Sequence, residues 1–528
     1  MKRTLSRVLC LAMLLSMLLP GGALAENTRP TVVITIAQNT LTSDYEDNYF
    51  TKYVEDLCNV NLEFQFLPAT DTASKLALMV SAEENLGDAL IVYLDNNAVI
   101  SYANEGALQP MNAFYDKYDT NVEAYDAENN LGIMNQITMP DGNIYFMPSY
   151  IPADTNSTKY RAWINQKWLT NLGLQMPTTP EELYTVLKAF KEQDANGNGD
   201  PNDEIPMLGC VNAWSASPLP YLISMFTYCY GAGDGWGYQI TDGKINFMYT
   251  EEAYREALRY INKLVSEGLL AADTWTLSGS QYKEYCSKET ATTGVVFGTT
   301  TLSALDLSNK NVNDYDWLPY MKNADGKINV SFQPYDLAAS PKILIPRGSA
   351  NPELVFKMAD ALFSVDTYIR CRFGEEGIHY DIADASHNEA MQTKEWLLLE
   401  KKNFWGENNN MSWHLELGLL DRMYSSLWNG DPNFYNYKRY LAVQDMVANK
   451  PGPGEFVPPL SFTGDEIDEY SEMMSSIGTY WRECTTLFIL GEMNLDTDWD
   501  SYLKTLNEMG LEKYLSVVQG AYDRVYAK

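Results

Sequence analysis

The sequence predicts an α/β fold, and two observations carry that prediction. Near the start of the chain, apolar runs of the β-strand type are separated by helix-compatible segments. Further along, two amphipathic helical segments need a sheet to pack on. Strand, helix, strand, helix, strand at this spacing predicts a right-handed parallel unit, and open α/β sheets bind ligands at the carboxyl ends of such strands.

The elements of this unit follow one another in order. Residues 31–37 are a β-branched run, and a helical segment follows them to about Cys58. Residues 62–67 alternate apolar and polar as a half-buried strand does, residues 72–84 are helical, and residues 89–94 are again apolar. The loop Asp95-Asn96-Asn97 leaves the carboxyl end of this third strand.

After residue 148 the chain is dominated by helical blocks. Thr179 is a good N-cap for the first of these helices, and Glu182 completes a capping box. A second helix begins at Thr250 and ends at Gly268. Each helix has one apolar face, formed by Leu183, Val186, Leu187 and Phe190 in the first and by Ala257, Leu258, Ile261, Leu264 and Val265 in the second.

The first twenty-five residues are predicted to be a secretory signal peptide. They have a basic start, an apolar stretch from Val8 to Leu19, and Ala23-Leu24-Ala25 as a small-x-small cleavage site before Glu26. The apolar stretch is too short to span a bilayer core of about 30 Å. Cys10 lies at the beginning of that stretch, so we expect no lipobox and a secreted, extracellular protein that stays associated with the cell envelope.

Charge excludes several partners. The chain has 38 Lys and Arg against 70 Asp and Glu, a net charge of −32. Cleavage after Ala25 removes Lys2, Arg3 and Arg7 and no acid, which takes the mature chain to about −35 by the same count. This sign argues against nucleic acid and against an anionic lipid surface. It also favours neutral or cationic solutes weakly, because like charge slows the approach of a polyanion.

Enzyme motifs are absent from the sequence. It has no HExxH, no G-x-S-x-G and no Walker A motif, and His379, His387 and His414 have no metal spacing. The glycine stretch at 231–237 lacks a dinucleotide fingerprint. A secreted glycoside hydrolase stays open as an alternative, because it needs only two carboxylates.

The most specific chemical motif is a loop rich in oxygen side chains after the first amphipathic helix. Asp, Asn and Asn stand at loop positions 1, 3 and 5, with Gly at position 6, as a calcium loop of the EF-hand type requires. The predicted ligands of one structural Ca²⁺ are Asp194, Asn196, Asn198, Asp200 (through its carbonyl), Asp203 and Glu204. Ile205 occupies position 12 and Pro206 stops any exit helix, so half of an EF-hand is expected. The alternative is an Asn/Gly-rich turn without a metal.

Several stretches together resemble the family 1 extracellular solute-binding proteins of bacterial ABC importers. They are Trp163-Ile-Asn-Gln-Lys-Trp-Leu-Thr-Asn-Leu-Gly-Leu, the capped helix with its D-x-N-x-N-G loop ending in Asp203-Glu-Ile-Pro, Asp141-Gly-Asn-Ile-Tyr-Phe-Met-Pro, Gly374-Glu-Glu-Gly-Ile-His-Tyr, and the end of the chain from Phe488 to Arg524. The resemblance covers essentially the whole mature chain. Asn165 and Lys167 depart from it, since the family often has Arg and Asp before the Trp.

The resemblance implies a two-lobed, periplasmic-binding-protein-like α/β fold of type II, with the ligand cleft between the lobes. By analogy the first lobe would hold residues 26–148 and about 340–400, and the second lobe 149–339 and about 401–528. The expected function is capture of an oligosaccharide or other polyhydroxylated solute by lobe closure. The protein, a monomer without a transmembrane segment, would deliver the solute to the membrane permease subunits of an ABC importer.

Loop aromatics and nearby polar groups are the candidate ligand residues, because aromatic faces suit sugar rings and polar side chains suit hydroxyls. The candidates are Asp95, Asn97, Trp214, Trp236, Tyr335, Asp336 and Trp413. Each could instead serve packing or solvation. Trp163, Trp168 and Trp499 have helical or strand spacing and are predicted to be core. A non-transport surface carbohydrate-binding protein stays open as a further alternative to the importer receptor.

Overall fold

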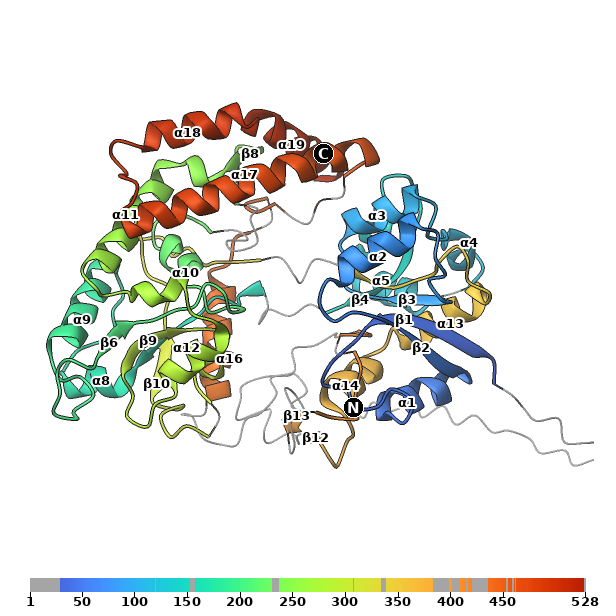
Figure 1. The fold of residues 1–528 in the computed structure, drawn as a ribbon, viewed down its shortest axis with the longest axis horizontal. Coiled ribbons are helices and arrows are strands. Elements are labelled where there is room, and N and C mark those ends of the chain that lie inside the picture. The colour runs from blue at the N-terminus through green and yellow to red at the C-terminus, as the bar shows by residue number, and fades with distance from the viewer. Residues whose placement is uncertain are drawn as a thin grey trace, which may run out of the picture.

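The computed structural model contains two α/β lobes (Figure 1). It describes residues 29–118, 120–151, 157–229, 237–306, 308–333, 339–382, 398–400, 408–414, 416–419, 435–452, 454–457, 460 and 462–526. No helix in these residues is long and apolar enough to cross a membrane.

The first lobe is built on a five-stranded sheet in the order β2-β1-β3-β11-β4. Its strands are β1 (Thr31–Ala37), β2 (Asn61–Leu67), β3 (Ala89–Ile91), β4 (Phe146–Tyr150) and β11 (Ala339–Leu344). β1 runs parallel to β2 and β3, which confirms the parallel unit predicted from the sequence. β11 is antiparallel to both β3 and β4, so a distant part of the chain joins the two.

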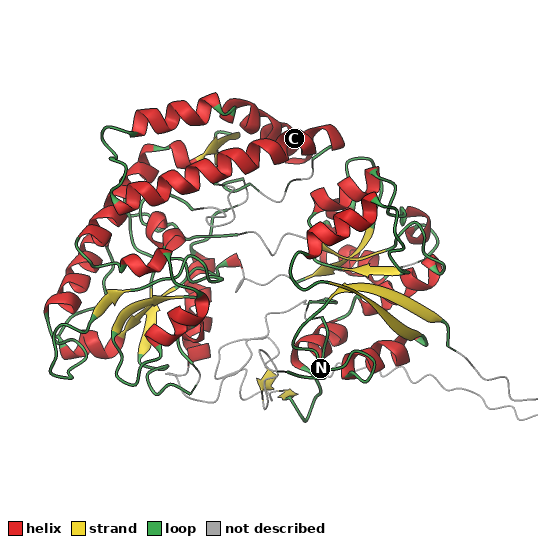
Figure 2. Ribbon diagram, in the orientation of Figure 1, coloured by secondary structure: helices red, strands yellow, loops and turns green. Residues whose placement is uncertain are grey.

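Helices lie on both faces of this sheet (Figure 2). They are α1 (Tyr49–Cys58), α2 (Thr72–Ser81), α3 (Asn96–Asn104), α4 (Asn112–Tyr115), α5 (Asn121–Asn129), α6 (Ile133–Ile137), α13 (Pro352–Leu362) and α14 (Val365–Phe373). A small hairpin of β12 (Tyr380–Ile382) and β13 (Leu398–Glu400) follows.

The second lobe has a four-stranded sheet in the order β10-β5-β9-β6 and a separate hairpin, β7-β8. Its strands are β5 (Ala162–Asn165), β6 (Ile205–Met207), β7 (Tyr238–Thr241), β8 (Lys244–Phe247), β9 (Thr293–Phe297) and β10 (Tyr315–Leu318). Its α-helices are α8 (Gln166–Asn171), α9 (Pro180–Glu192), α10 (Leu219–Ser224), α11 (Glu252–Ser266), α12 (Gly279–Cys286), α16 (Tyr435–Ala448), α17 (Gly464–Leu490), α18 (Trp499–Glu508) and α19 (Leu511–Tyr526). Short 3₁₀ turns are η1 (Met248–Thr250), η2 (Ala272–Trp275) and η3 (Thr301–Ser303).

The chain crosses between the lobes after β4, before β11 and again after Leu419. Two crossing segments touch in the described residues, because the amide of Gln333 donates to the carbonyl of Ser157 (2.8 Å). The part of the chain that returns to the first lobe was expected, by analogy with the family, to end near residue 400. In the structure it extends further. Asn409 accepts a hydrogen bond from the amide of Ser43 (2.9 Å), and Leu419 bridges β4.

The cap of α9 differs slightly from the predicted capping box. Thr179 Oγ1 accepts from the amide of Glu182 (3.2 Å), as expected. The carboxylate of Glu182 reaches one residue further back and accepts from the amide of Thr178 (2.8 Å). These bonds to the charged form lower the pKa of Glu182.

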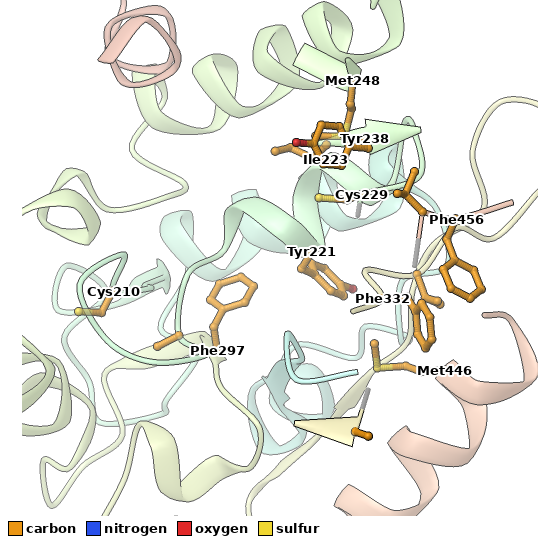
Figure 3. Packing of buried hydrophobic residues seen from close by; sticks show 14 of the residues in the cluster. Cys210, Tyr221, Ile223, Cys229, Tyr238, Met248, Phe297, Phe332, Met446 and Phe456 are labelled. Atoms are coloured by element: carbon orange, nitrogen blue, oxygen red, sulfur yellow. The ribbon is translucent and has the colours of Figure 1, made fainter. Parts of the chain in front are cut away.

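Aromatic side chains fill the cores, and the prediction that Trp163, Trp168 and Trp499 are core residues is confirmed, since each is at most 4% exposed. Figure 3 shows part of the second-lobe core, where Phe332 from a crossing segment packs against Phe456 (ring centroids 5.4 Å apart). The thiols of Cys210, Cys286, Cys371 and Cys484 are free and buried, and that of Cys58 is free and half-buried.

Gly294 in β9 allows α9 to approach the sheet. A Cβ at this position would lie 2.5 Å from Phe190 Cδ2 and 2.7 Å from the carbonyl oxygen of Pro206. We expect Gly294→Ala to destabilise the protein by about 1–3 kcal/mol, because the helix or the strand must move. Gly348→Ala is the matched control, since a Cβ there meets nothing within 4 Å. Urea unfolding of both variants measures the difference, and equal midpoints would contradict the expectation.

Candidate functional site

Loops at the carboxyl ends of parallel strands form the candidate site. In the second lobe β6 runs parallel to β9, and the loop after β6 carries Trp214. This loop is held by backbone and side-chain bonds: the amide of Cys210 donates to the carbonyl of Ala216 (2.9 Å), and the amide of Thr299, which follows β9, donates to Ser215 Oγ (3.1 Å). Trp214 remains 62% exposed on this fixed loop.

A cavity of about 420 Å³ lies beneath Trp214. It is lined by the loop after β6 and by the crossing segment that precedes β5. Residues of α10, η1, α11, η2 and α17 complete the lining. The lining residues are Lys159, Tyr160, Val211, Asn212, Ala213, Trp214, Ser215, Ser217, Leu219, Pro220, Ile223, Tyr249, Tyr254, Trp275, Trp481, Arg482, Thr485 and Thr486. We call it the Trp214 cavity. Its size is at the lower end of ordinary small-molecule sites.

Aromatic stacking shapes the walls of the Trp214 cavity. Tyr249 and Trp481 stack with their ring centroids 3.8 Å apart. Lys159 is buried, and its Nζ lies 5.0 Å from the ring centroid of Tyr160 and 5.9 Å from that of Trp214. The cavity therefore combines an exposed indole face, buried aromatic rings and a cation.

The first lobe presents a second exposed aromatic side chain near the carboxyl end of β3. Tyr93 is 63% exposed and stacks on His414 with centroids 5.3 Å apart. Lys342 Nζ lies 4.2 Å from the Tyr93 centroid and 3.2 Å from a carboxylate oxygen of Glu416. Burial lowers the pKa of Lys342, and the nearby Glu416 opposes that shift.

Asp95 and Asn97 also lie at this end of β3. Asp95 is exposed and caps α3, because its carboxylate accepts from the amide of Ala98 (2.8 Å). The Oδ1 atom of Asn97 is buried without a hydrogen-bond partner. Both residues therefore stand in the expected loop, where Asp95 already has a local structural role.

Trp413 has a packing position in the structure. It is 3% exposed, its Nε1 donates to Thr51 Oγ1 (2.9 Å), and its ring contacts Phe50 and Phe64. It supports the neighbouring His414 from within the first-lobe core. The predicted ligand residues Trp236, Tyr335 and Asp336 lie outside the described residues.

The predicted calcium loop connects α9 directly to β6, so a strand follows where a complete EF-hand would have a helix. Asp194 accepts hydrogen bonds from the amides of Asn198 and Gly199 (3.0 and 2.9 Å). Asp203 accepts from the side-chain amides of Asn196 and Asn198 (3.0 and 2.8 Å). The loop thus folds around its own carboxylates.

Glu204 is the most buried carboxylate of the loop. It is 9% exposed, its Oε1 accepts from the amide of Asn196 (3.3 Å), and its Oε2 is buried without a partner. Burial raises the pKa of Glu204. In the described residues no three His, Cys, Asp or Glu side chains converge on one point. A hard cation would therefore also need the amide and carbonyl oxygens of the loop.

Sequence reasoning missed Tyr93, Lys159, Trp481 and Arg482. Tyr93 had a signal, because it is an aromatic residue two positions before Asp95 at the end of a predicted strand. Trp481 and Arg482 had none: they lie within a long helix, and only the packing of α17 against α11 brings them to the loop after β6.

Two α/β lobes joined by crossing segments, with an aromatic cavity beside those segments, define a two-lobed binding protein. Residues 42–368 match the family described as bacterial extracellular solute-binding protein, and the chain belongs to this family. The fructooligosaccharide ABC transporter substrate-binding protein FusA of Streptococcus pneumoniae serotype 4 is 26% identical over 446 residues, which cover 81% of this chain and 78% of FusA.

Solved structures show the same fold. S. pneumoniae FusA in complex with kestose superposes with a TM-score of 0.76 at 24% identity, covering 94% of this chain and 99% of that one. An EF-hand mutant of FusA in complex with fructo-nystose gives a TM-score of 0.75 at 23% identity with the same coverage. The two-lobed fold inferred from the resemblance is confirmed. The family and these relatives are binding proteins.

His414 makes the stability of the first lobe depend on pH. Its Nδ1 accepts from the amide of Glu416 (3.1 Å), its Nε2 has no partner, and burial lowers its pKa well below the usual range, with Lys342 adding to the shift. The unfolded chain binds a proton near pH 6.5 that the folded protein does not. We expect the free energy of unfolding to fall below pH 6.5, by at most about 1.4 kcal/mol per pH unit from this group.

The variant His414→Asn keeps a hydrogen-bond acceptor and removes the titration. Melting temperatures of both proteins between pH 7.5 and 5 measure the effect. We expect a smaller pH slope in the variant, and parallel curves would show that His414 is not the group responsible.

Proposed function

We propose that this protein captures an oligosaccharide between its lobes and delivers it to the permease subunits of an ABC importer. The observation that carries the proposal is the exposed indole of Trp214 above a cavity beside the interlobe crossings. Such a face packs against the apolar C–H side of a pyranose or furanose ring. Asn212, Ser215 and Ser217 supply polar groups for hydroxyls at the same wall.

The exposed ring of Tyr93 in the first lobe supports the same proposal. Two exposed aromatic faces on different lobes suit a ligand that is held when the lobes rotate together. FusA, which is described as a fructooligosaccharide binder and is solved with kestose and fructo-nystose, offers neutral oligosaccharides as first ligands to try. The protein acts as a monomeric receptor and does not hydrolyse the bound sugar.

Titration calorimetry and small-angle scattering with oligosaccharides test this function. We expect the native protein to bind with a decrease in the radius of gyration and without release of reducing ends. Trp214→Ala should lose about tenfold or more in affinity, because stacking contributes on the order of 1 kcal/mol or more. Tyr285→Ala, an exposed aromatic on α12, is the control and should bind normally. Repeated turnover of the sugar would instead identify a hydrolase, and binding without compaction would identify a surface carbohydrate-binding protein.

We also propose that the protein is exported and cleaved after Ala25 without becoming a lipoprotein. The basic start, short apolar stretch and Ala-Leu-Ala site support this, as does membership of an extracellular family. N-terminal sequencing of the secreted protein decides the point, because the mature chain should begin at Glu26.

A structural Ca²⁺ in the loop after α9 is proposed on the chemistry of its donors. Asp194, Asn196, Asn198, Asp203 and Glu204 would hold the ion, with Asp200 adding its carbonyl. The buried, unpartnered Oε2 of Glu204 supports the proposal, because a cation would compensate it. The described EF-hand mutant of FusA also supports it. The ion would stabilise the turn from α9 into β6.

We expect a chelator to lower the melting temperature of the native protein and millimolar Ca²⁺ to restore it, since a ligand that binds only the folded state stabilises it. In Asp203→Asn the melting temperature should no longer respond to either addition. Asp325→Asn, in another exposed loop, is the control and should respond as the native protein does. An unchanged melting temperature on chelation would refute a filled site.

A further inference from the structure

We propose that the solute of this protein is an oligosaccharide with an anionic substituent, and that Arg482 in the Trp214 cavity recognises the negative charge. This inference rests on the proposed oligosaccharide-binding function and specifies its ligand. It runs against the preference for neutral or cationic solutes that the net charge of the whole chain suggests, because the charges near the cavity differ from those of the chain.

The charges that line the Trp214 cavity have one sign. Its described lining residues include Lys159 and Arg482 and no Asp or Glu, although the chain has 70 acids and 38 bases. A site that accepts neutral sugars needs acceptors for the hydroxyl protons, and carboxylates are strong acceptors. Lys and Arg side chains can only donate hydrogen bonds. This wall is therefore complementary to an anionic group, which can only accept them.

Arg482 is placed to meet a ligand. It is exposed on α17, and its guanidinium carbon lies 5.1 Å from the ring centroid of Trp481. This contact places the guanidinium beside the indole at the cavity wall. The planar set of N–H donors of an arginine matches a carboxylate or a sulfate. No described carboxylate lies within ion-pair distance of this guanidinium.

Indole donors without partners accompany the two cations. Trp275 Nε1 and Trp481 Nε1 are buried and make no hydrogen bond, and both residues line the cavity. An indole N–H can only donate. These two indole donors add to the donors of the two cations at the same wall, where Tyr249 Oη, which can donate or accept, is also buried without a partner.

Buried charge near the interlobe crossings has the same sign. Among the described residues, the buried charged side chains are Asp88, Lys159, Arg161, Glu204, Lys342 and Lys438. Lys159 and Arg161 belong to the crossing segment before β5, and Lys342 lies in β11 next to another crossing. Burial lowers the pKa of Arg161 to about 9, so its positive charge persists at neutral pH. Salt and solvent screen buried charges less than exposed ones, and Glu416 partly offsets the charge of Lys342.

Calorimetry of the mature protein with charge-matched sugar pairs tests the inference. The acidic probes are trimers of galacturonate, glucuronate and mannuronate and a sulfated trisaccharide; their neutral partners are the methyl esters and the desulfated sugar, with kestose as a further neutral probe. We expect at least one acidic probe to bind about tenfold or more tightly than its neutral partner, with an affinity that falls as salt is raised. If the uronate trimers show this preference, the anionic group is a carboxylate. If the sulfated trisaccharide shows it, the group is a sulfate.

The variant Arg482→Gln should reduce the preference for the acidic partner to about threefold or less while neutral sugars bind as before. Lys504→Gln, which removes the same charge from exposed α18, is the matched control and should keep the preference. Neutral sugars that bind at least as tightly as every acidic partner would overturn this inference and leave the proposed function standing. A full preference in Arg482→Gln would overturn the assignment of Arg482. Absence of binding by every probe would contradict both proposals.

Discussion

The insertion of β11 between β3 and β4 is the contact on which the two-lobe arrangement depends. Without it, the facing edges of β3 and β4 would leave backbone N–H and C=O groups unpaired inside the lobe, which is costly. The chain must therefore leave the first lobe after β4, build most of the second lobe, and return. The second lobe is in this sense an insertion into the first, and the chain connects the two lobes at each crossing.

The same topology places charge and aromatic groups where a ligand would be enclosed. Exposed acids pair with exposed bases at many surface positions, and such pairs contribute little to stability. The buried cations Lys159, Arg161 and Lys342 instead lie in or next to the crossing segments, and Lys342 is paired with Glu416. The net charge of a chain does not by itself give the potential within a cleft, because buried groups in low dielectric are screened less than exposed ones.

Local patterns predicted the elements well. The β-branched run at 31–37 is a strand with those limits, and the apolar face of α9, with Leu183, Val186, Leu187 and Phe190, is buried. Spacing also placed Trp163, Trp168 and Trp499 in the core. These properties follow from periodicity, which a single sequence contains.

Tertiary contacts were beyond such reasoning. Trp413 looks like an exposed loop aromatic in the sequence, yet it packs on Phe50 and Phe64 because residues 408–414 fold back over the start of the first lobe. Tyr249 and Trp481 meet although more than two hundred residues separate them. The extension of the first lobe beyond residue 400 has the same origin, since no local signal marks where a chain changes lobes.

Helix α17 connects the two lobes mechanically. With 27 residues it is about 40 Å long. Helix α17 runs along the second lobe toward the first (Figure 1). Its first residue, Gly464, lies against the end of α3 in the first lobe, where even a Cβ would come within 2.8 Å of Asn104 Nδ2. Trp481 and Arg482, further along the same helix, line a cavity in the second lobe. A change in the angle between the lobes must either slide the Gly464 end across α3 or carry the helix with it. Glycine at this point permits the close approach of the two helices, so a rotation of the lobes would change this helix contact as well as the crossing segments.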